Sequence, residues 1–324
     1  MPVWMEWGIE WISAMQGAAP WARSVMQSLS FAGTEYFYFL VMPAVLWCVD
    51  SGIGVRAGLL LVTSAGLNDA LKVAFGLPRP YWISGEVTAL SGETSFGLPS
   101  GHAQNGVVLW GRLAAWARRW WFVFAAALVA FAVSLSRVFL GVHFPMDVLA
   151  GWAIGLGLLA LALTLEEPLR RSLARLRIWA QLGLVLLAST VMVGLGALSL
   201  KVTEARPFPA SWAENAATAR PADDPIDPRS LDPFVARGGA FFGLGGGAVL
   251  LASWGRFRAR SSLARSTARY AIGALGVLIV FLGLRAVFPA GEDWIGSLFR
   301  GLRYAALGFW ITYGAPRMFT LLGA

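Results

Sequence analysis

Three short segments of the sequence combine fixed positive charge with imidazole, a combination that suits the chemistry of a phosphoryl group. The segments are Lys72 to Pro80 with Arg79, then Pro99-Ser100-Gly101-His102, then Ser136 to Asp147 with Arg137 and His143. Lys72, Arg79 and Arg137 provide three cations for a group that spreads its charge over three oxygens. A guanidinium can also grip two of those oxygens at once. We therefore expect these three side chains to bind a phosphate.

The second segment has the composition of a helix start. Ser100 follows a proline and precedes an apolar run, so the pattern predicts an N-cap at this position. The backbone N–H groups of Gly101 and His102 would then lie at a helix N-terminus, where anions are favoured. Gly101 lets the backbone approach a phosphate closely. Ser100 and Gly101 are therefore expected to complete the phosphate site.

The chain contains only two histidines, and both fall in these segments. Asp147 follows His143 by four residues, so its carboxylate can accept the proton of one ring nitrogen and leave the other as a nucleophile. His102 is expected to protonate the leaving oxygen. No cluster of carboxylates or histidines has the spacing of metal ligands, which fits a site with neither a metal nor another cofactor.

Taken singly, these residues have ordinary structural explanations. An arginine at the end of a span is commonly an interfacial anchor, and a first-turn aspartate is favoured by the helix dipole. Their coincidence in residue type, spacing and membrane side favours a functional site.

The elements that position these segments are apolar helices. Of 324 residues, 57% are hydrophobic and only 14% are charged, whereas a soluble domain has about 25% charged residues. The apolar residues form blocks of about 20, the length of helix that crosses a bilayer. We predict nine spans, near residues 33–49, 53–72, 101–117, 120–140, 146–165, 178–199, 236–254, 270–288 and 301–322.

The predicted fold is an all-α polytopic membrane helix bundle of about nine transmembrane helices, preceded by an interfacial helix. Residues 1–30 form the amphipathic N-terminal segment, in which Trp4, Trp7 and Trp11 recur at helical spacing. Residues 31–200 form the membrane core. Residues 201–235, rich in Pro, Ala and Asp, are predicted to be an irregular extracytoplasmic loop. Residues 236–324 form a C-terminal extension of three helices.

The charges predict the orientation of the chain. Loops reached after odd-numbered spans contain 14 of the 26 basic residues, Arg256 among them, and three of the 18 acidic residues. Because positive charge concentrates in cytoplasmic loops, this face is predicted to be cytoplasmic. Residue 1 and all three segments then lie outside the cytoplasm, and residue 324 lies inside. The basic residues sit in short loops between spans, so we expect a lipid bilayer and no nucleic acid as partner.

The three segments resemble the signature of the type 2 phosphatidic acid phosphatase superfamily: Lys-x6-Arg-Pro, Pro-Ser-Gly-His and Ser-Arg-x5-His-x3-Asp, with every fixed position present. The resemblance covers roughly residues 33–165. It implies that His143 forms a phosphohistidine, that Asp147 orients it, and that His102 protonates the leaving group. It also implies that Lys72, Arg79, Ser100, Gly101 and Arg137 hold the phosphate without a metal. Arg79-Pro-Tyr-Trp82 and the nine-span layout are similar to the glucose-6-phosphatase and sphingosine-1-phosphate phosphatase branch.

The expected function is therefore hydrolysis of a lipid phosphate or polyprenyl diphosphate at the extracytoplasmic face of a membrane. The excess of arginine over lysine is typical of high-GC bacteria, so a bacterial membrane is expected. A sugar-phosphate phosphatase is an alternative, as is a lipid transporter or scaffold without catalysis. A vanadate haloperoxidase uses a similar site, but those relatives are soluble. The sequence assigns neither the headgroup nor the oligomeric state.

Overall fold

Helices account for all regular structure in the part of the chain that the computed structural model describes, which is residues 1–255, 257–289, 291 and 293–323. Arg256, counted above toward the cytoplasmic face, lies outside these residues. The described chain divides into two compact units. Unit 1 comprises residues 1–37, 67–160 and 198–230, and unit 2 comprises residues 38–66, 161–197 and 231–324.

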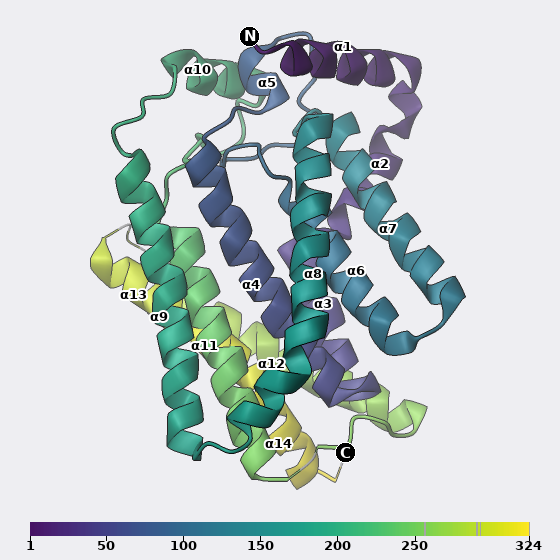
Figure 1. Ribbon diagram of the computed structural model, residues 1–324, viewed down its shortest axis with the longest axis vertical. Coiled ribbons are helices and arrows are strands. Elements are labelled where there is room, and N and C mark those ends of the chain that lie inside the picture. Colours follow the sequence, from purple (N-terminus) through teal and green to yellow (C-terminus); the bar gives the residue numbers. More distant parts are fainter. Residues whose placement is uncertain (256, 290, 292, 324) are drawn as a thin grey trace. The chain divides into compact units, whose positions relative to one another are not determined.

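Unit 1 contains all eight residues predicted to form the site. Its helices are α1 (Val3–Ala18), η1 (Pro20–Ala22), α2 (Arg23–Phe31), α5 (Pro80–Ile83), α6 (Gly101–Ala117), α7 (Trp120–Phe139) and α10 (Ala210–Ala219), with the end of α4 (Ser51–Phe75), the first part of α8 (Pro145–Leu173) and the end of α9 (Ile178–Thr203). Figure 1 shows α1, α5 and α10 at the end of the unit where α7 ends and α8 begins.

Unit 2 is built around α11 (Asp232–Ser253) and α13 (Trp294–Phe309). It also contains most of α3 (Glu35–Ala44), then η2 (Val45–Val49), α12 (Leu263–Val287), η3 (Trp310–Gly314), α14 (Ala315–Leu321) and the remaining parts of α4, α8 and α9. Gly308 allows close packing of the two central helices, because a Cβ there would lie 2.7 Å from the backbone nitrogen of Leu244. The Trp47 indole donates to the Ile311 carbonyl at 2.9 Å.

Helices occur at all nine positions predicted to span the membrane. Among the described residues, six are long and apolar enough to cross a membrane, or seven if the bent pair Pro20–Phe31 and Glu35–Val49 counts as one span. Two predicted spans fall short of that test. Helix α6 has 17 residues, and the segment predicted at 301–322 is divided among α13, η3 and α14. The number nine therefore stays a prediction.

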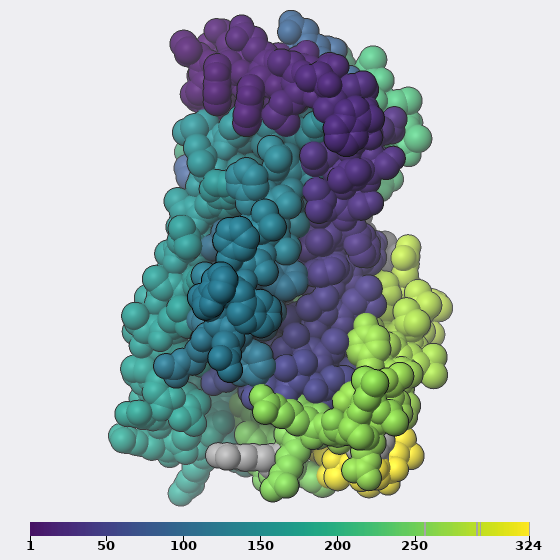
Figure 2. Space-filling view, turned by 90° about the vertical axis from the view of Figure 1, so that its right-hand side faces the viewer, coloured from purple at the N-terminus to yellow at the C-terminus, as the bar shows by residue number. Residues whose placement is uncertain are grey.

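Helix α7 shows why these helices belong in lipid. Its side chains Trp120, Trp121, Phe124 and Phe131 are all more than half exposed. This face, blue-teal in Figure 2, is turned toward the viewer. So much exposed aromatic surface is costly in water, and lipid chains would cover it.

The connection between α6 and α7 decides where their functional residues lie. Arg118 ends α6 in the left-handed region with φ 52°, and Arg119 precedes the first residue of α7. This tight turn folds the two helices back on each other, so the start of α6 and the end of α7 lie at the same end of unit 1. His102 is thereby brought to the same level as Arg137.

The hydrophobic core of unit 1 also lies at that end. Ile12 of α1, Trp82 of α5, Phe96, and Phe144 beside α8 are fully buried in one cluster. The Trp4 ring packs edge-on against Phe144, with centroids 5.4 Å apart. Helix α1 is therefore packed onto the segment that carries the third motif, and Figure 2 shows it lying across the end of the unit.

Residues 201–235 are more regular than predicted. They contain the ten-residue helix α10, which packs against α5. Trp212 lies 6.2 Å from Trp82 between ring centroids, and the Asn215 amide donates to the Trp82 carbonyl at 2.9 Å. The prediction of an irregular loop was wrong here because Ala210–Ala219, although short, is rich in helix-forming alanine and gains tertiary contacts.

Candidate active site

The three predicted segments come together at one end of unit 1. The Ser100 N–H donates to the carbonyl of Asp147 at 2.9 Å, which joins the second segment to the third. The Arg79 Nη1 donates to the Val142 carbonyl at 2.8 Å, which joins the first segment to the third. Residues far apart in the chain thus form one cluster at the ends of four helices.

Small residues on α8 allow this approach. A Cβ at Gly151 would lie 2.7 Å from the Ser100 carbonyl oxygen, and one at Gly155 would lie 2.8 Å from that of Gln104. Both distances are too short for a real side chain. The start of α8, which carries Asp147, can therefore pack against the start of α6 only because these positions are glycine.

His143 and Asp147 form a buried pair. The ring Nδ1 lies 3.1 Å from Asp147 Oδ2, which also accepts from the Phe144 N–H at 3.0 Å. The other ring nitrogen, Nε2, lies 3.3 Å from Arg79 Nη1. Because a guanidinium only donates hydrogen bonds, Nε2 must act as the acceptor, which places the ring proton on Nδ1 facing Asp147. The lone pair on Nε2 therefore points into the cluster of cations.

Arg79 is entirely buried and held on several sides. Its Nε donates to the Ser95 carbonyl at 2.6 Å, and its Nη2 donates to the Phe96 carbonyl at 3.1 Å. Ser95 Oγ accepts from the same Nη2 at 3.1 Å and from Lys72 Nζ at 2.9 Å. Two of the predicted cations thus share one hydroxyl group and have fixed orientations.

Arg137 is also buried, with 2% of its surface exposed. Its Nη1 donates to Ser30 Oγ of α2 at 2.6 Å, and its Nη2 is ion-paired with Glu93. Its Nε has no hydrogen-bond partner within the described part of the chain. The guanidinium is therefore held from two sides, and its Nε–H remains available to donate to a ligand.

Ser100 and His102 lie at the start of α6 with unused polar atoms. Ser100 occupies the N-cap position, but the predicted capping bond is absent, and its buried Oγ lacks a partner among the residues described. The Ser100 hydroxyl is therefore available to a ligand. The buried Nε2 of His102 likewise lacks a partner in the described residues. His102 lies within electrostatic range of Arg137, Glu93, Lys72 and Arg79.

The electrostatics of the site keep His143 neutral. Burial lowers the pKa of His143 well below its ordinary value, and the positive charges of Arg79, Lys72 and Arg137 lower it further. At pH 7 the imidazole therefore carries a lone pair on Nε2 rather than a proton. A neutral imidazole next to three cations can attack a phosphorus atom whose oxygens those cations hold.

A metal site was not predicted, and the described residues contain no group of three or more His, Cys, Asp or Glu side chains arranged to hold a metal ion. The cationic side chains of the cluster suit an anion instead.

Glu93, Ser95 and Ser30 contact the predicted cations but were missed at the sequence level. Glu93 and Ser95 belong to the loop 84–100, which connects the first two segments. Their position in a short polar stretch between two motifs was a usable signal. No sequence signal pointed to Ser30, because it lies about forty residues before the first motif. Only the packing of α2 against α7 brings it to Arg137.

Two family models match this chain. A family model described as the PAP2 superfamily matches residues 53–171, and one described as the transmembrane extension of PAP2 superfamily phosphatases matches residues 235–324. Together with the six apolar helices, these matches show a multi-pass membrane protein.

Three relatives indicate the range of similarity. The chain is 28% identical to glucose-6-phosphatase 3 of Bos taurus, over 74% of each chain. It is 28% identical to phosphatidylglycerophosphatase B of Bacillus subtilis, over 47% of this chain and 79% of that protein. It is 30% identical to undecaprenyl-diphosphatase of Sulfolobus acidocaldarius, over 45% of this chain and 71% of that protein.

Proposed function

Because the chain belongs to the PAP2 superfamily, we propose that it is a metal-independent phosphatase acting on a lipid phosphate or polyprenyl diphosphate through a phosphohistidine. The observation that carries this proposal is the arrangement of His143, whose Nε2 lone pair faces Arg79 while Nδ1 faces Asp147. An acceptor nitrogen aimed at the cations that would hold the phosphate is the geometry an attacking nucleophile needs.

The reaction proceeds in two displacements. In the first, the His143 Nε2 lone pair forms a bond to phosphorus while the bond from phosphorus to the leaving oxygen breaks. His102 donates a proton to that oxygen, and Asp147 stabilises the positive charge that develops on His143. In the second, His102 accepts a proton from water, whose oxygen attacks phosphorus. The phosphorus–nitrogen bond breaks, and inorganic phosphate is released.

The phosphate is held by the groups that surround this path. Lys72, Arg79 and Arg137 neutralise its oxygens, and each guanidinium is already oriented by hydrogen bonds to the protein. The unpartnered hydroxyl of Ser100 and the backbone at Gly101 add neutral donors at the start of α6. Since these donors are in place before substrate arrives, little reorganisation is needed as charge moves onto the oxygens.

A phosphate-release panel tests the function. We expect the purified protein to release phosphate from lipid phosphates in excess EDTA, and to be inhibited by orthovanadate, which adopts the five-coordinate geometry of the displacement. The panel should include phosphatidic acid, phosphatidylglycerophosphate and a polyprenyl diphosphate. Complete loss of release in chelator would refute the metal-free mechanism.

A soluble sugar phosphate is the second candidate substrate. It is supported by the similarity to glucose-6-phosphatase 3, which extends over 74% of this chain. A hexose phosphate in the same panel separates the two, since a lipid phosphatase will turn over the long-chain substrate with the higher kcat/KM. Release from none of these substrates would favour a non-catalytic lipid transporter or scaffold.

We propose further that the site faces away from the cytoplasm, in a bacterial cell membrane. The distribution of positive charge among the loops supports this orientation. Glu86 is exposed in the loop that also carries Glu93, so a cysteine there reports the side of the site. In a Cys48→Ser background, Glu86→Cys should react with a membrane-impermeant maleimide in intact cells, whereas Arg171→Cys should react only after permeabilisation. The reverse pattern would show that the orientation is wrong.

A further inference from the structure

Glu93 places a carboxylate among the cations that are proposed to bind phosphate. One carboxylate oxygen is ion-paired with Arg137 Nη2, and the other lies 3.6 Å from Arg79 Nη2. Lys72 and His102 are within electrostatic range of the same carboxylate. Every cationic side chain of the proposed phosphate site thus interacts with Glu93.

The surroundings keep this carboxylate charged. Burial alone would raise the pKa of Glu93, but the positive charges of Arg137, Arg79 and Lys72 outweigh that effect and hold the pKa well below its ordinary value. Glu93 is therefore an anion throughout the neutral range. It pairs with the same cations that are proposed to bind the substrate phosphate.

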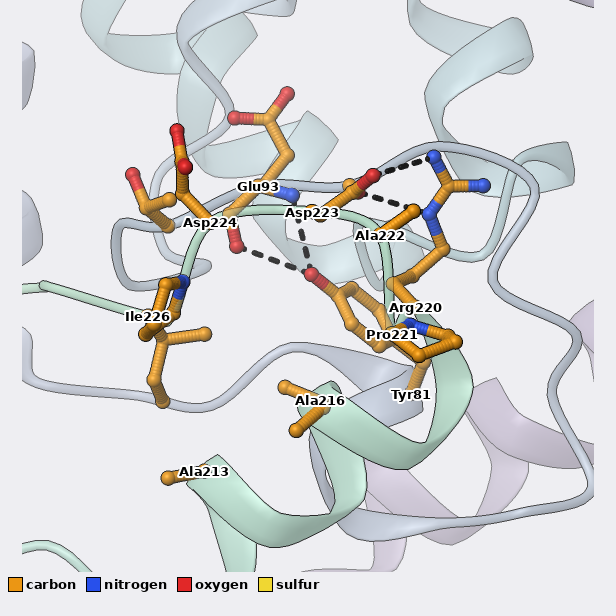
Figure 3. A pocket seen from close by; sticks show the side chains of 14 residues that line it. Tyr81, Glu93, Ala213, Ala216, Arg220, Pro221, Ala222, Asp223, Asp224 and Ile226 are labelled. Carbon is orange, nitrogen blue, oxygen red and sulfur yellow. Dashed lines mark hydrogen bonds and ion pairs between the residues drawn. The ribbon is translucent and has the colours of Figure 1, made fainter.

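The backbone at Glu93 is anchored, and its side chain is partly exposed. The Tyr81 hydroxyl donates to the Glu93 carbonyl at 3.0 Å and accepts from the Glu93 N–H at 3.1 Å. Glu93 also lines a cavity of about 660 Å³, whose other lining residues include Asp224 and the ion pair of Arg220 with Asp223 (Figure 3). The side chain is 27% exposed. The loop backbone is therefore held independently of the ion pairs that the Glu93 carboxylate makes.

We propose that Glu93 is an intramolecular competitor of the substrate, pairing with the phosphate-binding cations until the substrate phosphate displaces it. This inference rests on the proposed function, because it takes Lys72, Arg79 and Arg137 as the groups that bind phosphate. The Glu93 carboxylate takes up one Arg137 donor and cancels part of the positive charge, so phosphate and Glu93 compete for the same cations.

This competition has a consequence for a protein in a bilayer. Phosphodiester headgroups of membrane lipids carry one negative charge and are present at high local concentration. A tethered carboxylate in the site lowers the apparent affinity for every anion, so these weakly bound headgroups are kept out. A phosphomonoester or diphosphate, with two or more charges, retains enough affinity to displace it.

Direct binding of soluble anions tests the proposal without requiring turnover. The affinities of the purified full-length protein for inorganic phosphate and for dimethyl phosphate, a monoanionic diester, are measured by calorimetry. Glu93→Gln keeps the shape of the side chain and removes its charge, so we expect both anions to bind about tenfold more tightly than to the parent protein. Glu86→Gln makes the same substitution at an exposed site in the same loop and should leave both affinities unchanged.

Each outcome decides the question. Unchanged or weaker phosphate binding in Glu93→Gln would overturn the proposal and make Glu93 a structural partner of Arg137. Glu93→Ala, which removes the side chain entirely, serves as the second variant if the first is unstable, with the same expected increase. Tighter binding in a protein that hydrolyses no lipid phosphate would uphold the competition while refuting the proposed function.

Discussion

Replacing His143 with alanine is expected to lower kcat by about 10⁴-fold or more, because the proposed covalent path has no other nucleophile. In the described structure, the Nε2 of His143 is the ring nitrogen that faces the guanidinium of Arg79. The measurement is phosphate release from the best lipid substrate, together with trapping of the phosphoenzyme. A phosphohistidine should be stable in base and labile in acid, and the variant should form none.

Phosphate binding by the His143→Ala variant shows whether the substitution removes only catalysis or also disturbs the folded site. Lys72, Arg79 and Arg137 remain in the His143→Ala variant, so it should still bind inorganic phosphate with an affinity near that of the parent protein. Near-normal turnover, or a phosphoenzyme that still forms, would remove His143 from the role of nucleophile. Loss of phosphate binding as well would show that the substitution had disturbed the site, and His143→Gln would then be needed.

Replacing His102 with alanine is expected to lower kcat by about 10²- to 10⁴-fold on a lipid phosphate, the range typical of a lost general acid. The buried Nε2 of His102 is unpartnered in the described structure and lies among Arg137, Glu93 and Lys72. Arrival of a phosphate dianion adds negative charge beside the ring and favours its protonated form. The proton can then pass to the leaving oxygen.

The dependence on leaving group distinguishes this role from a structural one. An alkoxide needs a proton as it departs, whereas a nitrophenolate does not. The His102→Ala variant should therefore lose much less activity on an aryl phosphate than on an alkyl phosphate, provided that the first displacement limits both rates. An equal loss on both substrates would mean that His102 only positions the phosphate, and no loss would exclude it from the mechanism.

The residues of the proposed site could be picked out from the sequence because they are recognised by residue type at short spacings. His143 and Asp147 are four residues apart across the start of one helix, and Arg79 and Ser100 stand beside prolines that define the local backbone. Long apolar blocks predicted the helices equally well, because burial in lipid imposes a minimum helix length. These features are local, so no knowledge of the tertiary fold was needed to recognise them.

Only the tertiary structure showed which residues far from the motifs in sequence contact the site residues. Ser30 contacts Arg137 because α2 packs against α7, and α10 packs on α5 although its segment was predicted to be irregular. Glu93 lies in the polar loop between the first two motifs, but its carboxylate meets Arg137 and Arg79 only once α4, α6 and α7 are assembled. Side-chain contacts between distant segments are set by packing and charge in three dimensions, and sequence spacing does not record them.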